Sequence, residues 1–377
     1  MAGELLNTAA IGVHDDLFEL GATSITAMRL VVLVEQRFGT VIPLSELIAS
    51  PTVADLAARV SEAEGTGHGG GAAERFDPLV PIRTGGDRAP LFYVHPMGGN
   101  VLCYVPFAKR LPPDRPMYAL QAFGTDAGTE PVRGMEAIAA GYIEAVRRVQ
   151  PHGPYHIGGW SFGGFVAFEM ARQLRAAGEE IASLVVLDTT ALNPERRERT
   201  DDEALIAWFF WELLWLQRGG ESPEAVIPAE LTTLDEKFEY ITALAVAEGV
   251  LPPGSTDAIV RRLFRLYEAN WRSAFDYWPE EVDQDMVLVH AVEPLPEVLL
   301  SMHTAIRSMH EDPANGWRQR TSGRLTVVEA EGDHLTIMEE PYVAAVAAAA
   351  VGAAEAAEAD QADEAFGGGA GAEREVR

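Results

Sequence analysis

The chain has a single cysteine, Cys103, among its 377 residues, so an internal disulfide is impossible. This agrees with a reducing compartment. Long apolar runs are missing too: no stretch approaches twenty apolar residues without a charged residue or a proline, so a membrane span is not expected. The N-terminal segment MAGELLNTAAIGVHDD lacks a basic region followed by an apolar one, which argues against a secretion signal. We therefore expect a cytoplasmic protein.

Basic residues are scarce, with 29 Lys and Arg against 57 Asp and Glu, and the formal net charge is −28. Such a chain would bring like charges together on nucleic acid and has no basic stripe to release counterions, so nucleic acid is not an expected partner. Hydrophobic residues make up 47% of the chain, enough to build a core. The length exceeds that of a common single domain and allows two.

A glycine-rich stretch, SEAEGTGHGGGAAERFD, interrupts two patterned regions and is typical of a flexible linker. Before it, Ser24 opens the apolar-periodic run ITAMRLVVLVEQRF, and two prolines separate further short helical runs, which predicts a small helical bundle. The last residues are rich in Ala, Gly and acidic side chains and are expected to be disordered. We therefore predict a helical domain, a linker, a larger domain and an acidic tail (residues 1–62, 63–77, 78–352 and 353–377).

The larger domain alternates apolar strands with helical runs. Five strands are predicted from short apolar segments, at residues 91–96, 155–160, 182–189, 285–292 and 324–330. Continuous apolar strands separated by helices indicate a mostly parallel sheet with helices on both faces. Strand patterns are missing from about 195 to 275, where a helical insertion would cover the C-terminal edge of the sheet.

The sequence Gly-Trp-Ser-Phe-Gly ends one predicted strand and opens a helix, as the G-x-S-x-G nucleophile motif of an α/β-hydrolase requires. Gly159 and Gly163 allow the chain to reverse without clashes, while Ser161 is held in a strained conformation that exposes its hydroxyl. The alternative is a glycine-rich turn of no catalytic meaning. The flanking strand and helix favour Ser161 as a nucleophile.

A serine nucleophile needs a histidine base and a carboxylate to orient that base, in the chain order Ser, acid, His. His334 follows the last predicted strand, where the fold delivers its histidine. The other candidates are expected to be surface or packing histidines: His95, His152, His156, His290, His303 and His310. For the acid, Asp188 and Glu293 each end a strand, and Asp333 is a third option that we expect to stabilise its own loop instead. Asp188 is favoured.

Two backbone N–H groups are expected to form the oxyanion hole. One belongs to Phe162, directly after the nucleophile, and the other to the loop after the first predicted strand, where HPMGGN makes Met97 the candidate. No metal ligands are predicted.

Four segments of the larger domain together resemble the C-terminal thioesterase domain of nonribosomal peptide synthetases. They are FYVHPMGGN, GGWSFGG, VVLDT and GDHLTIM, and they span residues 91–338. The resemblance implies an α/β-hydrolase fold in which these segments supply the oxyanion loop, the nucleophile, the catalytic Asp188 and the histidine loop. It also implies that residues 195–275 form a lid over the acyl chain.

The segment DDLFELGATSITAMRL is similar to the signature of the peptidyl carrier domain of the same synthetases. The resemblance implies that Ser24 carries 4'-phosphopantetheine, added by a separate phosphopantetheinyl transferase, and that upstream synthetase modules deliver the chain. Ser24 could instead be only a helix N-cap. Two departures stand out: Ala22 and Thr23 replace commoner residues, and the first helix is short, so the bundle could be truncated.

These observations predict a terminal thioesterase. Ser161 would take a peptidyl thioester from the arm, and the acyl-enzyme would then be released by hydrolysis or by macrocyclisation. Six lid aromatics could line an acyl chamber, although aromatics at helical spacing are more often part of a core: Trp208, Phe209, Phe210, Trp211, Trp215 and Trp271. Two alternatives stay open at this point, namely an esterase or lipase that acts on free small esters and a non-enzymatic interaction module.

Overall fold

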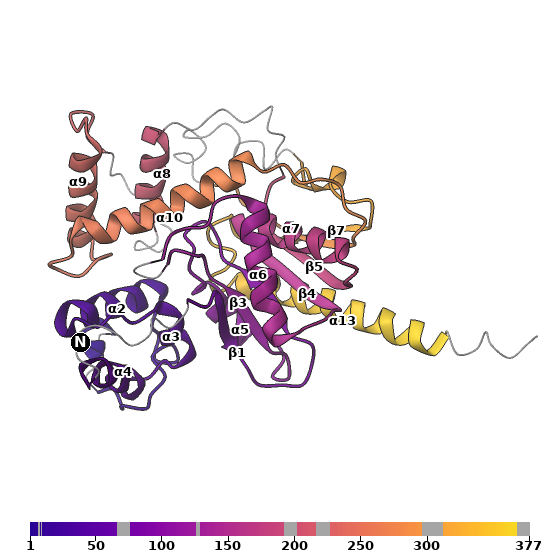
Figure 1. Cartoon of the computed structure of the whole chain (residues 1–377), viewed down its shortest axis with the longest axis horizontal. Helices are drawn as coiled ribbons and strands as arrows, with labels where there is room; N and C mark the ends of the chain where they lie inside the picture. Colours follow the sequence, from indigo (N-terminus) through magenta and orange to yellow (C-terminus); the bar gives the residue numbers. More distant parts are fainter. Residues whose placement is uncertain are drawn as a thin grey trace, which may run out of the picture.

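The computed structural model describes residues 1–6, 8, 10–65, 76–125, 129–191, 202–215, 227–295 and 312–367. A small helical bundle at the N-terminus lies beside a larger α/β unit, and a group of helices covers one end of that unit (Figure 1). Among the described ranges, no helix is long and apolar enough to cross a membrane.

The described part of the N-terminal bundle contains four helices, namely α1 (Ala2–Leu5), α2 (Ser24–Phe38), α3 (Leu44–Ala49) and α4 (Val53–Gly65). Helix α2 begins after Thr23, whose hydroxyl accepts a hydrogen bond from the N–H of Thr26, and it ends at Gly39 in the left-handed conformation. Helix α4 extends into the segment predicted as linker, of which residues 66–75 lie outside the described part of the chain.

The larger unit is built on a seven-stranded sheet in the order β1-β3-β2-β4-β5-β6-β7. All neighbours are parallel except β1, which runs antiparallel to β3. The strands are β1 (Leu79–Arg83), β2 (Leu91–Val94), β3 (Met117–Leu120), β4 (Tyr155–Trp160), β5 (Ile181–Leu187), β6 (Met286–Ala291) and β7 (Leu325–Ala330). The five predicted strands are present. The prediction missed β1, which contains Pro81, and β3, which directly follows Pro116, because a proline in or beside a short apolar run is typical of a turn or loop.

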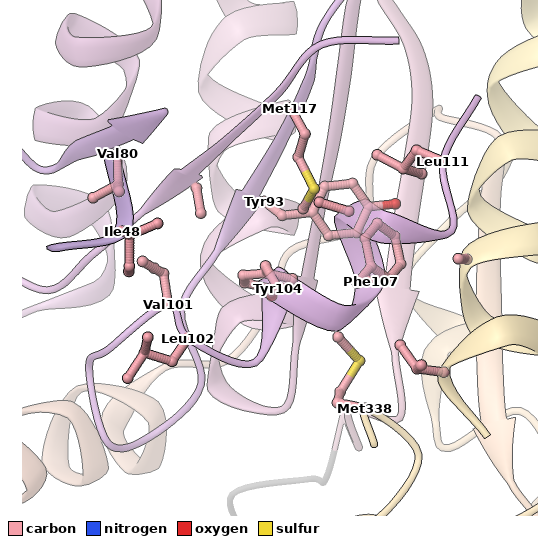
Figure 2. Packing of buried hydrophobic residues seen from close by; sticks show 14 of the residues in the cluster. Ile48, Val80, Tyr93, Val101, Leu102, Tyr104, Phe107, Leu111, Met117 and Met338 are labelled. Carbon is pink, nitrogen blue, oxygen red and sulfur yellow. The ribbon is translucent and has the colours of Figure 1, made fainter. Parts of the chain in front are cut away.

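Helices cover both faces of the sheet, which confirms the predicted α/β-hydrolase class. One core lies between the sheet and α6 (Met135–Val149) with α7 (Phe162–Ala176). The other lies between the sheet and α5 (Tyr104–Lys109) with α13 (Val343–Gly367). Figure 2 shows this second core, where Tyr93, Tyr104 and Phe107 pack ring against ring.

The N-terminal bundle shares the second core. Ile48 of α3 and Val80 of β1 belong to one buried cluster and lie near each other in Figure 2. At the rim, Lys109 of α5 donates to the carbonyl of Phe18 at 3.3 Å and pairs with Glu19 at 3.0 Å. The bundle therefore packs against the larger unit instead of being connected to it only through the linker.

The C-terminal segment differs from the predicted tail. Disorder was expected from residue 353, whereas α13 stays helical to Gly367. That expectation is wrong for residues 353–367, because alanine and glutamate favour a helix and the acidic side chains meet cations on the domain surface. Arg88 donates to Glu355 at 3.0 Å, and the fully buried Arg115 pairs with Glu358 at 2.5 Å. Residues 368–377 lie outside the described part of the chain.

The insertion between β5 and β6 forms a helical lid, as predicted. It contains α8 (Asp202–Trp215), α9 (Leu234–Ala247) and α10 (Asp257–Asp276). Thr233 and Glu236 form a capping box that fixes the start of α9. The three helices have an apolar core of their own, and in Figure 1 α10 runs from above α2 of the bundle toward the upper end of α6.

Candidate active site

Ser161 sits on a tight strand-to-helix turn between β4 and α7. Its backbone has φ 56° and ψ −121°, a conformation that residues other than glycine rarely adopt. The turn closes only because its neighbours are glycine: a Cβ on Gly159 would lie 2.2 Å from the carbonyl oxygen of Gly163, and one on Gly163 would lie 2.2 Å from that of Val94. The N–H of Ser161 donates to Leu187 of β5 at 3.0 Å. The strained turn thus holds the serine at the end of the sheet.

Ser161, His334 and Asp188 form one hydrogen-bonded chain, although 173 and 146 residues separate the bonded partners. His334 Nε2 lies 2.9 Å from Ser161 Oγ, and His334 Nδ1 lies 2.8 Å from Asp188 Oδ2. An ionised carboxylate only accepts, so we assign the imidazole proton to Nδ1, which leaves Nε2 free to accept from the serine hydroxyl. This is the arrangement that a serine nucleophile and its base require.

The environment of Asp188 keeps it ionised. Burial alone would raise its pKa, but hydrogen bonds from His290 and His334 lower it well below its usual range. The N–H of Ala291 also donates to Asp188 Oδ1 at 3.0 Å. The pKa of His334 is shifted the other way: burial lowers it, but the hydrogen bond to Asp188 and nearby negative charges outweigh burial and raise it. The imidazolium formed during proton transfer is therefore stabilised.

Neighbouring groups hold the turn and the histidine loop in place. The hydroxyl of Tyr104 donates to Val94 at 2.6 Å and accepts from the N–H of Trp160 at 3.1 Å. The indole of Trp160 donates to the backbone carbonyl of His334 at 3.1 Å. Thr189 donates to the carbonyl of Ser161 at 2.6 Å. Our sequence reasoning missed Tyr104 and Thr189, since nothing in their local sequence shows that they lie beside the turn.

The two alternative acids lie elsewhere. The side chain of Glu293 is exposed to solvent. Asp333 Oδ1 accepts from the backbone of Leu335 and Thr336 at 2.9 and 3.0 Å, so this carboxylate stabilises its own loop. Of the three carboxylates weighed in the sequence, Asp188 is the one bonded to His334.

Two other histidines, His95 and His156, are fixed by packing contacts. His95 bonds Tyr142 at 2.8 Å, His156 bonds Ser183 at 2.8 Å, and burial lowers the pKa of both histidines to about 4. His290 behaves differently from its prediction as an ordinary packing residue, because its Nδ1 lies 3.5 Å from Asp188. Its position on β6, beside the strand that Asp188 ends, is the signal that could have identified it. His303 and His310 lie outside the described residues.

The predicted oxyanion donors lie at the same site. Phe162 is the first residue of α7, and the first N–H groups of a helix have no partner within the helix. Met97 lines the same cavity as Ser161 and Phe162, and its carbonyl accepts from Asn270 of the lid at 2.9 Å. The lid thus contacts the loop that carries the second expected donor.

A cavity of about 1120 Å³ opens over Ser161 and His334 beneath the lid. Trp208 and Trp271 of the lid line it, together with the half-buried Glu212. Of the other lid aromatics considered in the sequence, Phe209 and Phe210 belong to the apolar core of the lid, Trp211 is buried but does not line the cavity, and the side chain of Trp215 lies outside the described part. Burial raises the pKa of Glu212, opposed by a hydrogen bond from Tyr267 and by the charge of His334.

The same cavity continues to the N-terminal bundle, where Thr23 and Thr26 at the start of α2 line it. Helix α2 begins at Ser24, whose side chain lies outside the described part. Two arginines also line the cavity, Arg29 on α2 and Arg262 on α10, and the Nε atom of each is buried with no hydrogen-bond partner among the described residues. Unpaired donors beside a cavity that leads to Ser161 fit a phosphate-bearing arm attached at the start of α2.

Comparisons with known proteins agree with this architecture. Residues 89–350 match the thioesterase domain family, and residues 1–60 match the phosphopantetheine attachment site family. A dimodular nonribosomal peptide synthase of Bacillus subtilis (strain 168) is 38% identical over 225 residues, which are 59% of this chain and 9% of that protein. Chondramide synthase cmdD of Chondromyces crocatus is 31% identical over 348 residues, 90% of this chain and 8% of that protein.

The solved structures include holo-AB3403, a four domain nonribosomal peptide synthetase bound to AMP and glycine. It has a TM-score of 0.66 and 31% identity over 92% of this chain and 25% of that one. This chain therefore spans only a small part of the synthetases that it matches. The resemblance noted in the sequence is confirmed, as is the prediction of a thioesterase enzyme. The chain belongs to the thioesterase domain family, and its thioesterase domain follows a phosphopantetheine attachment domain.

Proposed function

We propose that this chain releases an acyl or peptidyl group from its own carrier domain, with Ser161 as nucleophile, His334 as base and Asp188 as the group that orients the base. The observation that carries the proposal is the bonded chain of these three side chains, at 2.9 and 2.8 Å, inside a cavity that continues to the start of α2. An esterase for free small molecules would have no use for that continuation.

In the first half of the reaction, His334 Nε2 takes the proton of Ser161 as Oγ attacks the thioester carbonyl. The developing oxyanion would accept from the N–H groups of Phe162 and Met97, each donor being worth about 3 kcal/mol of transition-state stabilisation. His334 then gives its proton to the departing thiol, and the acyl group stays on Ser161 as an ester. Asp188 remains ionised throughout and keeps the imidazole in the productive tautomer.

In the second half, His334 activates a second nucleophile. Water gives a linear acid, whereas an amine or hydroxyl within the substrate gives a macrocycle. The balance depends on how well the lid excludes water while the chain folds back. Trp208 and Trp271 provide an apolar wall for this step.

We further propose that Ser24 is the attachment point of 4'-phosphopantetheine, whose thiol holds the acyl group as a thioester. The carrier domain would comprise residues 1–62, the linker 63–77 and the thioesterase 78–352, with α13 extending the thioesterase to Gly367. A phosphopantetheinyl transferase would modify Ser24, and upstream synthetase modules would supply the peptide in the cytoplasm. These proposals are supported by the match of residues 1–60 and by synthetase relatives on both sides of the linker.

Intact-protein mass spectrometry tests the proposal. Ser24 is loaded with an acyl-phosphopantetheine by a transferase, and the parent is compared with Ser161→Ala. We expect both chains to gain the mass of the arm and only the parent to lose the acyl group. The released mass distinguishes a cyclic product from a linear acid, because the acid is heavier by one water.

The second candidate, an esterase acting on free esters, predicts a different result. It would turn over small esters at the same rate whether or not Ser24 is loaded, and Ser24→Ala would behave as the parent. Loss of the acyl group at equal rates with and without Ser161 would exclude both functions.

A further inference from the structure

Two arginines line the cavity that leads from the carrier domain to Ser161. Arg29 lies on α2, one and a half turns after Ser24, and Arg262 lies on the lid helix α10. Both side chains are half-buried. The cavity wall between the carrier and the lid therefore holds two guanidinium groups, one from each domain.

In the part of the chain that the structure describes, neither arginine has an anionic partner. Among the described residues, Arg29 and Arg262 make no ion pair or side-chain hydrogen bond, and the Nε atom of each is buried without an acceptor. The neighbouring Arg261 shows the usual arrangement on this helix, since it bonds Asp257 and Asp235 at 2.7 Å each. Unpaired cations beside a cavity are unexpected in a chain with a net charge of −28, which offers many carboxylates as partners. A buried donor without an acceptor also costs free energy, so a ligand that supplied the acceptor would be favoured.

The acidic lining of the same cavity does not neutralise them. Glu35 of α2 also lines the cavity, yet no bond joins it to either arginine among the described residues. Glu212 lies deeper, beside Tyr267 and His334. These carboxylates would repel an incoming anion. Arg29 and Arg262 would attract it, so the two arginines provide a binding site for negative charge at the carrier end of the cavity.

The chemistry of the pair matches a phosphate group. A guanidinium group is planar, always charged and able to donate two parallel hydrogen bonds to phosphate oxygens. Ser24 and Arg29 are five positions apart on α2, about 7.5 Å along the helix axis. Thr23, which precedes Ser24, lines the same cavity as Arg29 and Arg262, so a phosphodiester attached at the start of α2 would enter the cavity that both arginines line.

We propose that Arg29 and Arg262 together bind the phosphodiester of the prosthetic arm, so that the lid recognises the modified carrier domain. The proposal rests on the proposed attachment at Ser24. Because one arginine belongs to the carrier and the other to the lid, a phosphate bound by both joins α2 to α10 and directs the arm toward Ser161. Unmodified carrier would dock without this contact.

The test compares two ligands that differ only in the phosphate. The full chain is prepared with Ser24 unmodified, as verified by mass, and the dissociation constants of free 4'-phosphopantetheine and free pantetheine are measured by calorimetry at low salt. We expect phosphopantetheine to bind about tenfold more tightly, the effect of one or two charge-assisted hydrogen bonds. Added salt should reduce this preference.

Three variants assign the effect. Arg262→Gln and Arg29→Gln should each remove most of the preference for phosphopantetheine while leaving pantetheine binding unchanged. Arg265→Gln is the matched control, because this exposed arginine lies on the same helix but does not line the cavity; it should keep the preference. Equal binding of the two ligands by the parent, no binding of either, or the same loss for both ligands in Arg262→Gln would overturn the proposal.

A second measurement separates this proposal from the proposed function. The unmodified chain is given S-acyl-pantetheine and S-acyl-phosphopantetheine, and kcat/KM is measured for each. A preference for the phosphate-bearing thioester that disappears in Arg262→Gln supports the arginine site. Turnover of both thioesters at the same kcat/KM refutes the arginine site and leaves the proposed thioesterase function standing. Failure to cleave either thioester refutes the thioesterase function, and the calorimetry then decides whether the arginines bind the phosphate.

Discussion

Replacing Asp188 with asparagine tests how the site controls its histidine. The carboxylate of Asp188 accepts on both oxygens, from His334 Nδ1 at 2.8 Å and from the N–H of Ala291 at 3.0 Å. An asparagine has one oxygen and one amide nitrogen, so it can satisfy only one of these donors. If the asparagine oxygen accepts from the buried N–H of Ala291, its NH₂ group faces His334 Nδ1. Because an NH₂ group donates, Nδ1 must then be an acceptor and cannot carry the proton.

The consequence is the wrong tautomer of His334. With Nδ1 accepting, the proton moves to Nε2, which faces Ser161 Oγ at 2.9 Å and can no longer accept from it. Serine hydrolases with this arrangement lose about 10⁴-fold in kcat on such a change, or about 5.4 kcal/mol of activation free energy. We expect Asp188→Asn to show a loss of this order with little change in substrate binding.

The assay is the release of an acyl group from an N-acetylcysteamine thioester, with single-turnover acylation of Ser161 followed by mass spectrometry. Glu293→Gln is the matched control, because Glu293 was an alternative acid in the sequence and its side chain is exposed; it should leave acylation unchanged. A folded Asp188→Asn chain that keeps kcat within tenfold of the parent would refute the reasoning, as would a large loss in Glu293→Gln.

Two further predictions concern charges near the site and at the end of the chain. Ionised Glu212 helps to raise the pKa of His334, so Glu212→Gln should lower that pKa. His334 would then become neutral at a lower pH, and the acidic limb of the pH profile of kcat/KM should move to lower pH. Glu358→Gln removes the charge that pairs with the fully buried Arg115 and should lower the free energy of unfolding by about 3 kcal/mol, measured by urea denaturation.

Each of these two has its own check. A shift of the acidic limb to higher pH, or no shift, would show that Glu212 does not act on His334. For the C-terminal pair, Glu355→Gln is the control, since Glu355 is half exposed and its pair with Arg88 should contribute less than 1 kcal/mol. Equal losses in Glu355→Gln and Glu358→Gln would contradict the argument from burial.

The sequence by itself determined the features that depend on neighbouring residues. The alternation of apolar runs and helices placed five strands and the helical lid, and the spacing of Gly159, Ser161 and Gly163 identified the nucleophile turn, because only such residues close it. The position of His334 after the last strand followed from the same order of elements. The local sequence pattern was sufficient to predict these features because each depends on residues that are close together in the chain.

Only the tertiary structure decided which distant groups meet. Asp188, Glu293 and Asp333 were all acceptable from their neighbours in the chain, and the bond to His334 distinguishes Asp188 because parallel strands bring their ends to one edge of the sheet. Two pairings leave no trace in the local sequence and depend on how packed elements approach one another: Tyr104 with Trp160, and Arg115 with Glu358. The same holds for Arg29 and Arg262, which line one cavity. Packing therefore decided the surroundings of the site, whereas sequence decided its nucleophile.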